Sequence, residues 1–183
     1  FRDAGIHAYA PYVTLDRCWT GPAKYNFRIL DDIVRAYLSV DPDAHLTMLV
    51  RLVPPSWWFE SHPDEMVGYA TSDKIDSNDE SGRVLRPSPA SDVWRKESGE
   101  AWAALIRHIE AQPWGKRVIG WHACYGIYAE WHYFGSWTQQ YPDTGPAMTK
   151  TFRAYLRQQY GDAKKLQAAW QDPQVTFENA TVP

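Results

Sequence analysis

The feature of this sequence that could carry acid–base chemistry is a glutamate surrounded by aromatic residues. Glu130 lies in the stretch YGIYAEWHYFG, where Tyr128, Trp131 and His132 are within two positions of it. Aromatic neighbours remove water from a carboxyl group, so its pKa rises and it can donate a proton near neutral pH. We therefore single out Glu130 as a candidate general acid. Tyr128, Trp131 and His132 are candidate ligand-binding residues.

Two further loops carry aromatic side chains that could bind a ligand. Tyr12 lies at the end of one apolar segment and Trp19 follows it, and the adjacent Trp57 and Trp58 follow another segment. The face of an indole ring packs on the C–H groups of a sugar, and Trp and Tyr also offer a polar edge. Aromatic rings beside a few carboxylates are what a carbohydrate site requires, so the pattern predicts a carbohydrate ligand.

Three apolar segments have the composition of strands and alternate with helical patterns. The predicted strands are Ile6–Val13, His45–Val53 and Arg117–Tyr125, and the near-continuous apolar run of the second indicates a strand buried on both faces. The predicted helices, each with one apolar face, are Tyr25–Val40, Val93–Glu110, Thr149–Tyr160 and Asp162–Trp170. Alternation of this kind is typical of an α/β fold with a parallel sheet.

The carboxyl ends of parallel strands lie at one edge of a sheet, where α/β proteins build their sites. The loops after the three strands would therefore bring their aromatic and ionisable residues together. Residues 56–91, which are rich in Ser, Asp, Gly and Pro, predict a long surface excursion in one of these loops. The tryptophans that lie in or beside helices are expected to pack helices onto the sheet instead: Trp94, Trp102, Trp114 and Trp170.

The composition is that of a globular chain with an excess of aromatic residues. Its 183 residues are 44% hydrophobic and 22% charged, include 10 tryptophans, and carry a formal net charge of −3. These values favour neither nucleic acid nor a membrane as a partner, and no apolar run approaches the ~18 residues of a membrane helix. The first residues, FRDAGIHAYA, lack the apolar core of a signal peptide and are typical of the interior of a longer protein. Cys18 and Cys124 do not have the spacing of metal ligands, so we expect them to be buried free thiols. We also expect no cofactor.

Five stretches of the chain together carry a family resemblance. They are DDIVRAYL, VRLVPPSWWFESHPDEM, RPSPASDVWRKE, RVIGWHACYGIYAEW and FRAYLRQQYGDAKKLQAAW. This series, which covers nearly the whole chain, resembles the family 42 β-galactosidases of clan-A glycoside hydrolases. The resemblance implies a (β/α)8 barrel in which the three predicted strands are strands two to four. It also implies that Glu130, after the fourth strand, is the general acid/base of a retaining glycosidase.

Two positions depart from the pattern of that family. Ala129 precedes the glutamate where the family has an asparagine that contacts the sugar 2-hydroxyl. The first predicted strand lacks the family's arginine, although Arg17 follows it. A full barrel takes about 250 residues, so the three strands predict an incomplete barrel over residues 1–183, truncated at both ends. We expect the second catalytic carboxylate and the remainder of the barrel to come from further residues of this protein or from another chain.

Two other functions are compatible with these residues. A degenerate barrel could bind carbohydrate through the same aromatic rings without chemistry, and Ala129 favours that interpretation. A metal enzyme could use His62, His122, His132 or Cys124, but the chain has no HExxH motif, and single histidines are more often structural. We therefore predict no metal site.

Overall fold

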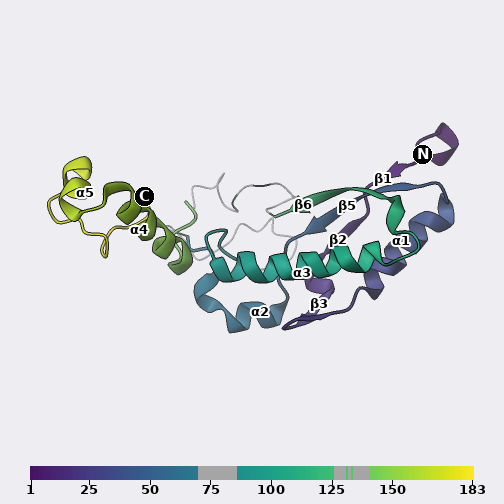
Figure 1. The fold of residues 1–183 in the computed structure, drawn as a ribbon, viewed down its shortest axis with the longest axis horizontal. Coiled ribbons are helices and arrows are strands. Elements are labelled where there is room, and N and C mark those ends of the chain that lie inside the picture. Colours follow the sequence, from purple (N-terminus) through teal and green to yellow (C-terminus); the bar gives the residue numbers. More distant parts are fainter. Residues whose placement is uncertain (70–85, 126–130, 132, 134–140) are drawn as a thin grey trace. The chain divides into compact units, whose positions relative to one another are not determined.

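The computed structural model describes residues 1–69, 86–125, 131, 133 and 141–183. The chain divides into two compact units. Unit 1 consists of Phe1–Ser61 and Arg95–His132, and unit 2 of His62–Trp94 and Tyr133–Pro183. The parallel sheet belongs to unit 1 (Figure 1).

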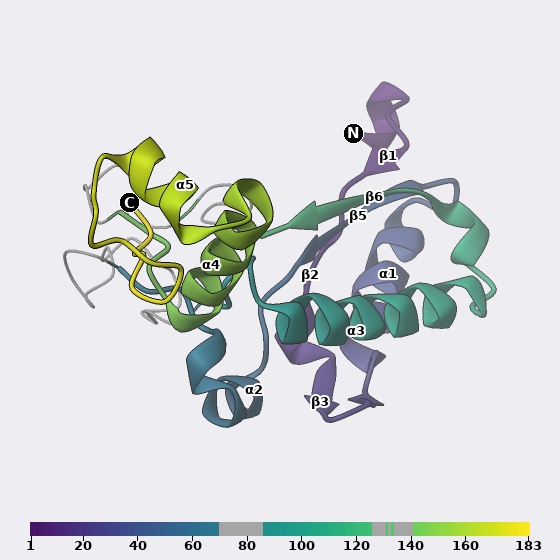
Figure 2. The same ribbon diagram turned by 60° about the vertical axis from the view of Figure 1, so that its left-hand side comes forward.

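The sheet of unit 1 has β5 (His45–Arg51) at its centre. β1 (Ala8–Tyr9) and β2 (Tyr12–Thr14) pair with β5 in parallel, and β6 (Val118–Cys124) pairs with it along the other edge. The predicted strand Ile6–Val13 is interrupted because Pro11 has no N–H group to donate to β5. The predicted parallel arrangement is confirmed, and the arrows of β5 and β6 point the same way in Figure 2.

Helices α1 (Arg28–Val40) and α3 (Asp92–Glu110) cover one face of this sheet, as their apolar faces predict. The alternate β5 residues Leu46, Met48 and Val50 are fully buried beneath them. Removal of these side chains from water holds the helices on the sheet. The rest of this core comprises Val13, Cys18, Leu30, Val34, Ala44, Leu105 and Ile109.

The opposite face of β5 is only half-buried. Thr47, Leu49 and Arg51 lie on it, because successive side chains of a strand point to opposite faces. Within His45–Arg51 the strand is fully buried on one face only, whereas the sequence predicts burial on both faces.

Short elements occupy segments of unit 1 that the sequence predicts as loops. β3 (Trp19–Gly21) and β4 (Lys24–Tyr25) form an antiparallel pair. α2 (Ser56–Ser61) follows two prolines and begins the predicted excursion 56–91, so the start of that excursion is helical. The remaining short helices of unit 1 are of the 3-10 type: η1 (Arg2–Ala4), η2 (Leu15–Arg17) and η4 (Gly115–Arg117).

Unit 2 contains α4 (Pro146–Tyr160) and α5 (Ala163–Trp170), both of which the sequence predicts. Gly161 ends α4 with a φ of 75°, a conformation that glycine adopts easily. The carboxylate of Asp162 then caps α5 by accepting a hydrogen bond of 3.0 Å from the backbone N–H of Lys165. The buried side chains that hold these helices to the C-terminal segment are Leu156, Leu166, Val175 and Ala180.

The other segments of unit 2 meet around a buried carboxylate, that of Asp143. They include the 3-10 helix η3 (Pro63–Glu65) and two isolated strand bridges, Met66 with Pro87 and Tyr69 with Pro142. In the described part of the chain, no helix is long and apolar enough to cross a membrane.

Candidate functional site

The carboxyl ends of three strands meet at one edge of the sheet in unit 1. Pairing aligns Thr14 of β2, Arg51 of β5 and Cys124 of β6 in one row. The preceding row on the same face consists of Tyr12, Leu49 and His122. The edge predicted to gather functional side chains therefore exists, and Tyr12, a candidate ligand-binding residue, lies on it with 44% of its surface exposed.

Trp131 is fixed to the end of β6. Its indole N–H donates a hydrogen bond of 2.7 Å to the carbonyl of Ala123, the penultimate residue of the strand. Its ring also stacks on that of Tyr125, with 5.6 Å between ring centroids and 22° between ring planes. The Trp131 side chain is nevertheless 64% exposed. A large ring held in one orientation and open to solvent can serve as a binding surface for an apolar ligand face.

Two tryptophans predicted to bind ligand are buried. Trp58 is 0% exposed, and its N–H donates a hydrogen bond of 2.7 Å to the Glu97 carboxylate. Trp19 is 2% exposed. A ring without an open face cannot stack on a sugar, so the prediction is corrected for these two residues. They belong to the packing of unit 1, because Trp57 donates to the Trp19 carbonyl at 3.4 Å and meets its ring edge-on at 5.3 Å.

Unlike Trp19 and Trp58, Trp57 is only half-buried, so part of its surface remains open to solvent. Two of the four tryptophans expected to pack helices onto the sheet do so, since Trp102 and Trp114 pack against its core. Trp94 is buried. The prediction is wrong for Trp170 of α5, which stacks on Phe152 of α4 at 6.2 Å, within unit 2.

The candidate acid/base Glu130 lies outside the described residues, as do the candidate ligand-binding residues Tyr128 and His132. The nearest described residues on either side are Tyr125 and Trp131. Both belong to unit 1 and contact one another.

Arg51 brings a positive charge to the carboxyl edge of the sheet, a feature that the sequence analysis did not single out. Its Nε is buried without a hydrogen-bond partner among the described residues. A buried donor left without an acceptor costs about 1–3 kcal/mol, so this nitrogen needs a partner that the described residues do not supply. The only sequence signal is that an arginine interrupts the apolar run HLTMLVRLV near its end.

The two cysteines are buried thiols, and the described residues contain no cluster of metal-ligating side chains. Cys18 and Cys124 are free and buried, as predicted. Burial raises the pKa of Cys18 to about 11 and also raises the pKa of Cys124, so neither thiol is a nucleophile at neutral pH. Among the residues that the structure describes, no group of three or more His, Cys, Asp or Glu side chains could hold a metal ion.

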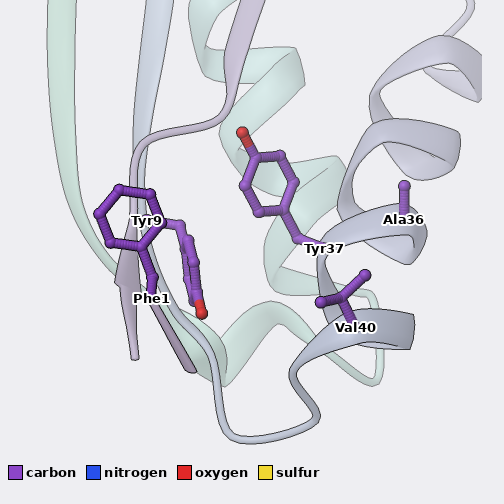
Figure 3. A pocket seen from close by; sticks show the side chains of 5 residues that line it. All are labelled: Phe1, Tyr9, Ala36, Tyr37 and Val40. Carbon is purple, nitrogen blue, oxygen red and sulfur yellow. The ribbon is translucent and has the colours of Figure 1, made fainter. Parts of the chain in front are cut away.

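An apolar cavity of about 410 Å³ lies at the opposite, amino edge of the sheet (Figure 3). It is lined by Phe1, Tyr9, Ala36, Tyr37 and Val40. Tyr9 pairs with Leu46 at the start of β5, whereas the candidate site lies where β5 ends at Arg51. The cavity is therefore separate from the candidate site.

Comparison with known proteins places this geometry in a family. The sequence model of the β-galactosidase family, glycoside hydrolase family 42, matches residues 20–174. No curated protein matches the chain. Two similar solved structures are β-galactosidases. The enzyme of the psychrophilic Marinomonas ef1 has 18% identity and a TM-score of 0.60, over 96% of this chain and 29% of its own. The cold-adapted enzyme of Rahnella sp. R3 has 17% identity and a TM-score of 0.60, over 100% of this chain and 25% of the enzyme's chain.

A third similar structure is the catalytic domain of a β-amylase from Paenibacillus polymyxa. It has 16% identity and a TM-score of 0.62, over 100% of this chain and 47% of its own. The chain thus spans less than half the length of each of these structures, and the likeness establishes a segment of a (β/α)8 barrel with parallel strands. Since the family match covers most of the sequence, the chain belongs to the β-galactosidase family of glycoside hydrolases, family 42.

Proposed function

We propose that this chain supplies the acid/base side of the active site of a retaining glycosidase that acts on β-galactosides. The observation that carries the proposal is the anchoring of Trp131 at the carboxyl end of β6, because Glu130 directly precedes it in the sequence. Family membership supports a carbohydrate substrate. The carboxyl edge of a parallel sheet is also where barrel enzymes carry their catalytic groups.

Glu130 has two roles in the proposed mechanism. In the first step its carboxylic acid protonates the glycosidic oxygen as the bond from that oxygen to the anomeric carbon breaks, and a second carboxylate attacks the anomeric carbon. In the second step the Glu130 carboxylate removes a proton from water, which displaces the second carboxylate and releases the sugar. The two carboxyl groups of a retaining enzyme lie about 5 Å apart.

Exposed aromatic and polar groups of unit 1 line the proposed sugar site. Trp131 offers an open ring, Tyr12 lies on the same edge of the sheet, and Trp57 is partly open. Tyr128 and His132 remain proposed ligand-binding residues on the basis of their positions beside Glu130.

We further propose that the second carboxylate and the remaining strands come from the rest of a larger barrel, in the same protein or in another chain. The half-buried face of β5 supports this, since a closed barrel covers that face with side chains from its other strands. Native mass spectrometry and thermal unfolding of the isolated 183 residues test it. We expect self-association or a non-cooperative transition, and a stable, cooperatively folding monomer would contradict the proposal.

Replacement of Glu130 in the full-length protein tests its catalytic role. Glu130→Gln should lower kcat for lactose at least 100-fold, because general acid catalysis contributes roughly 10²- to 10⁴-fold. Glu130→Ala should keep most of kcat/KM for 2,4-dinitrophenyl β-D-galactoside, because this leaving group needs no protonation in the first step. Its kcat should still fall, because the second step lacks its general base. Glu110→Gln, which changes an exposed glutamate of α3, is the matched control and should keep full activity.

The same experiment separates catalysis from binding alone. Unchanged lactose turnover in Glu130→Gln would end the assignment of Glu130. Binding of glycans by the unsubstituted full-length protein without release of reducing sugar would instead favour a non-catalytic carbohydrate-binding barrel, the function that Ala129 suggests.

A further inference from the structure

We propose that Tyr125 is a positioning residue, which fixes the ring of Trp131 as a one-sided platform for the apolar face of a galactoside. The proposal rests on the function proposed above. It adds the residue that orients the platform and the part of the sugar that the platform contacts.

The hydrogen bond of Trp131 limits what its ring can recognise. Indole has a single donor and no acceptor, and this donor is committed to the Ala123 carbonyl at 2.7 Å. No N–H group remains to bind a sugar hydroxyl. Trp131 can therefore contribute only the face of its ring, through contact with C–H groups.

The direction of the Ala123 carbonyl explains where the ring sits. The next carbonyl, that of Cys124, accepts a hydrogen bond of 2.7 Å from Leu52 and so points toward β5. Because backbone carbonyls alternate in direction along a strand, the Ala123 carbonyl points away from β5. Trp131 is thus bound at the carboxyl end of β6, to a carbonyl that takes no part in the pairing with β5.

Tyr125 decides which side of the Trp131 ring is open. The two rings lie nearly parallel, 22° apart in plane and 5.6 Å between centroids, and Tyr125 itself is buried. One face of the indole is consequently covered, while 64% of the Trp131 side chain stays exposed. The hydrogen bond fixes one edge of the ring and the stack fixes its tilt, so among the described residues only one face of the ring is covered.

The apolar side of a galactopyranoside suits an aromatic ring that offers no hydrogen-bond donor to the sugar. The hydrogens on C3, C4 and C5 of β-galactose lie on one side of the ring, opposite the axial 4-hydroxyl, and make that side apolar. A flat aromatic face can pack on this patch with no polar group buried. The platform would therefore bind the apolar side of the galactose ring and leave the hydroxyls to other side chains.

Binding of methyl 1-thio-β-D-galactopyranoside to the full-length protein, followed by calorimetric titration, tests the role of Tyr125. We expect Tyr125→Leu to raise Kd about 3- to 10-fold, the range for loss of one aromatic pair. Tyr125→Phe keeps the stacked ring and should stay within twofold of the unsubstituted protein. In lactose hydrolysis the Tyr125→Leu effect should fall on KM, with kcat changed less than twofold. A role in stability alone would lower the melting temperature and leave Kd unchanged.

Trp131 provides a second variant that does not threaten the fold, because its side chain is exposed. Trp131→Ala should weaken binding at least as much as Tyr125→Leu, even if the latter fails to fold. Unchanged Kd in Trp131→Ala would overturn the platform, as would equal Kd values for a folded Tyr125→Leu and the unsubstituted protein. Since the thiogalactoside resists hydrolysis, this result is independent of Glu130. Full turnover in Glu130→Gln would refute only the acid/base role, whereas absence of thiogalactoside binding would refute the platform.

Discussion

The hydroxyl of Ser88 donates a hydrogen bond of 2.5 Å to Oδ2 of Asp143, 55 residues further along the chain. The other oxygen, Oδ1, accepts from the backbone N–H groups of Gly68 at 2.9 Å and Gly145 at 2.8 Å. A single buried carboxylate thereby joins three segments of unit 2 that are distant in the sequence. Hydrogen bonds to a charged acceptor are among the stronger ones in proteins.

Asp143→Ala should therefore lower the free energy of unfolding of the full-length protein by about 2–4 kcal/mol, because three donors lose a buried acceptor. Denaturant titration measures the loss, and hydrogen exchange should accelerate at the amides of Gly68 and Gly145. Asp64→Ala is the control, since it removes an exposed aspartate of η3 and should change stability by less than about 0.5 kcal/mol. Equal stabilities for the two variants would show that the carboxylate does not hold the unit together.

Two valines of α1 allow a matched test of the core of unit 1. Val34 is fully buried against the sheet, whereas Val40, at the end of the same helix, is 66% exposed. Val34→Ala should cost about 2–3 kcal/mol through lost burial and the cavity left behind. Val40→Ala should be neutral or slightly stabilising, because alanine favours a helix by about 0.5 kcal/mol over valine. Thermal unfolding of both variants in the full-length protein checks the difference, and equal losses would contradict the observed packing.

The periodicity of the sequence was enough to predict the sheet and its helices. The apolar run ending at Arg51 and the helical spacing that includes Leu30 and Val34 encode local structure directly, since burial on one face follows from residue order alone. The parallel arrangement follows from the alternation of these segments. The family resemblance then predicted which strands of a barrel these are, namely strands two to four.

The sequence could not predict which tryptophans are open to solvent. Trp57 and Trp58 are adjacent and chemically identical, yet only Trp58 is fully buried, and its N–H donates to a carboxylate 39 residues away. Asp143 was likewise indistinguishable from the other aspartates. Such contacts depend on tertiary neighbours that no local pattern encodes. Trp131 was predicted from its position, but its bond to Ala123 and its stack on Tyr125 emerge only from the fold.

The complete burial of Trp58 gives a further prediction. Trp58→Phe removes the N–H that donates to Glu97 and should lower stability by about 1–3 kcal/mol. KM for lactose in the full-length protein should stay unchanged, since a fully buried ring does not contact a ligand. Trp131→Phe should instead raise KM for lactose and leave stability unchanged, because it loses the hydrogen bond that orients an exposed ring. A raised KM with unaltered stability in Trp58→Phe would restore the original assignment of this ring to the sugar site.

Asp41 predicts a pH dependence of stability at the amino edge of the sheet. Its burial opposes ionisation, but its carboxylate lies 2.8 Å from Nδ1 of His7 and accepts a 2.9 Å bond from the hydroxyl of Tyr9. Together with the backbone N–H of Asp43, these groups outweigh burial and hold the pKa of Asp41 below its usual value.

A carboxyl group whose pKa is lower in the folded than in the unfolded state stabilises the fold above the unfolded pKa, near 4. This contribution is lost as the pH falls through the lower, folded pKa. Asp41→Asn should therefore be less stable than the unsubstituted chain at pH 6, and the gap should narrow as the pH falls below about 4. Asp16→Asn, at an exposed position, serves as the control and should show no such convergence. Urea unfolding at pH 6 and pH 3 measures the difference in free energy of unfolding between each variant and the unsubstituted protein. If this difference for Asp41→Asn stays constant or widens toward pH 3, the folded protein does not favour the ionised carboxylate of Asp41, and the prediction is wrong.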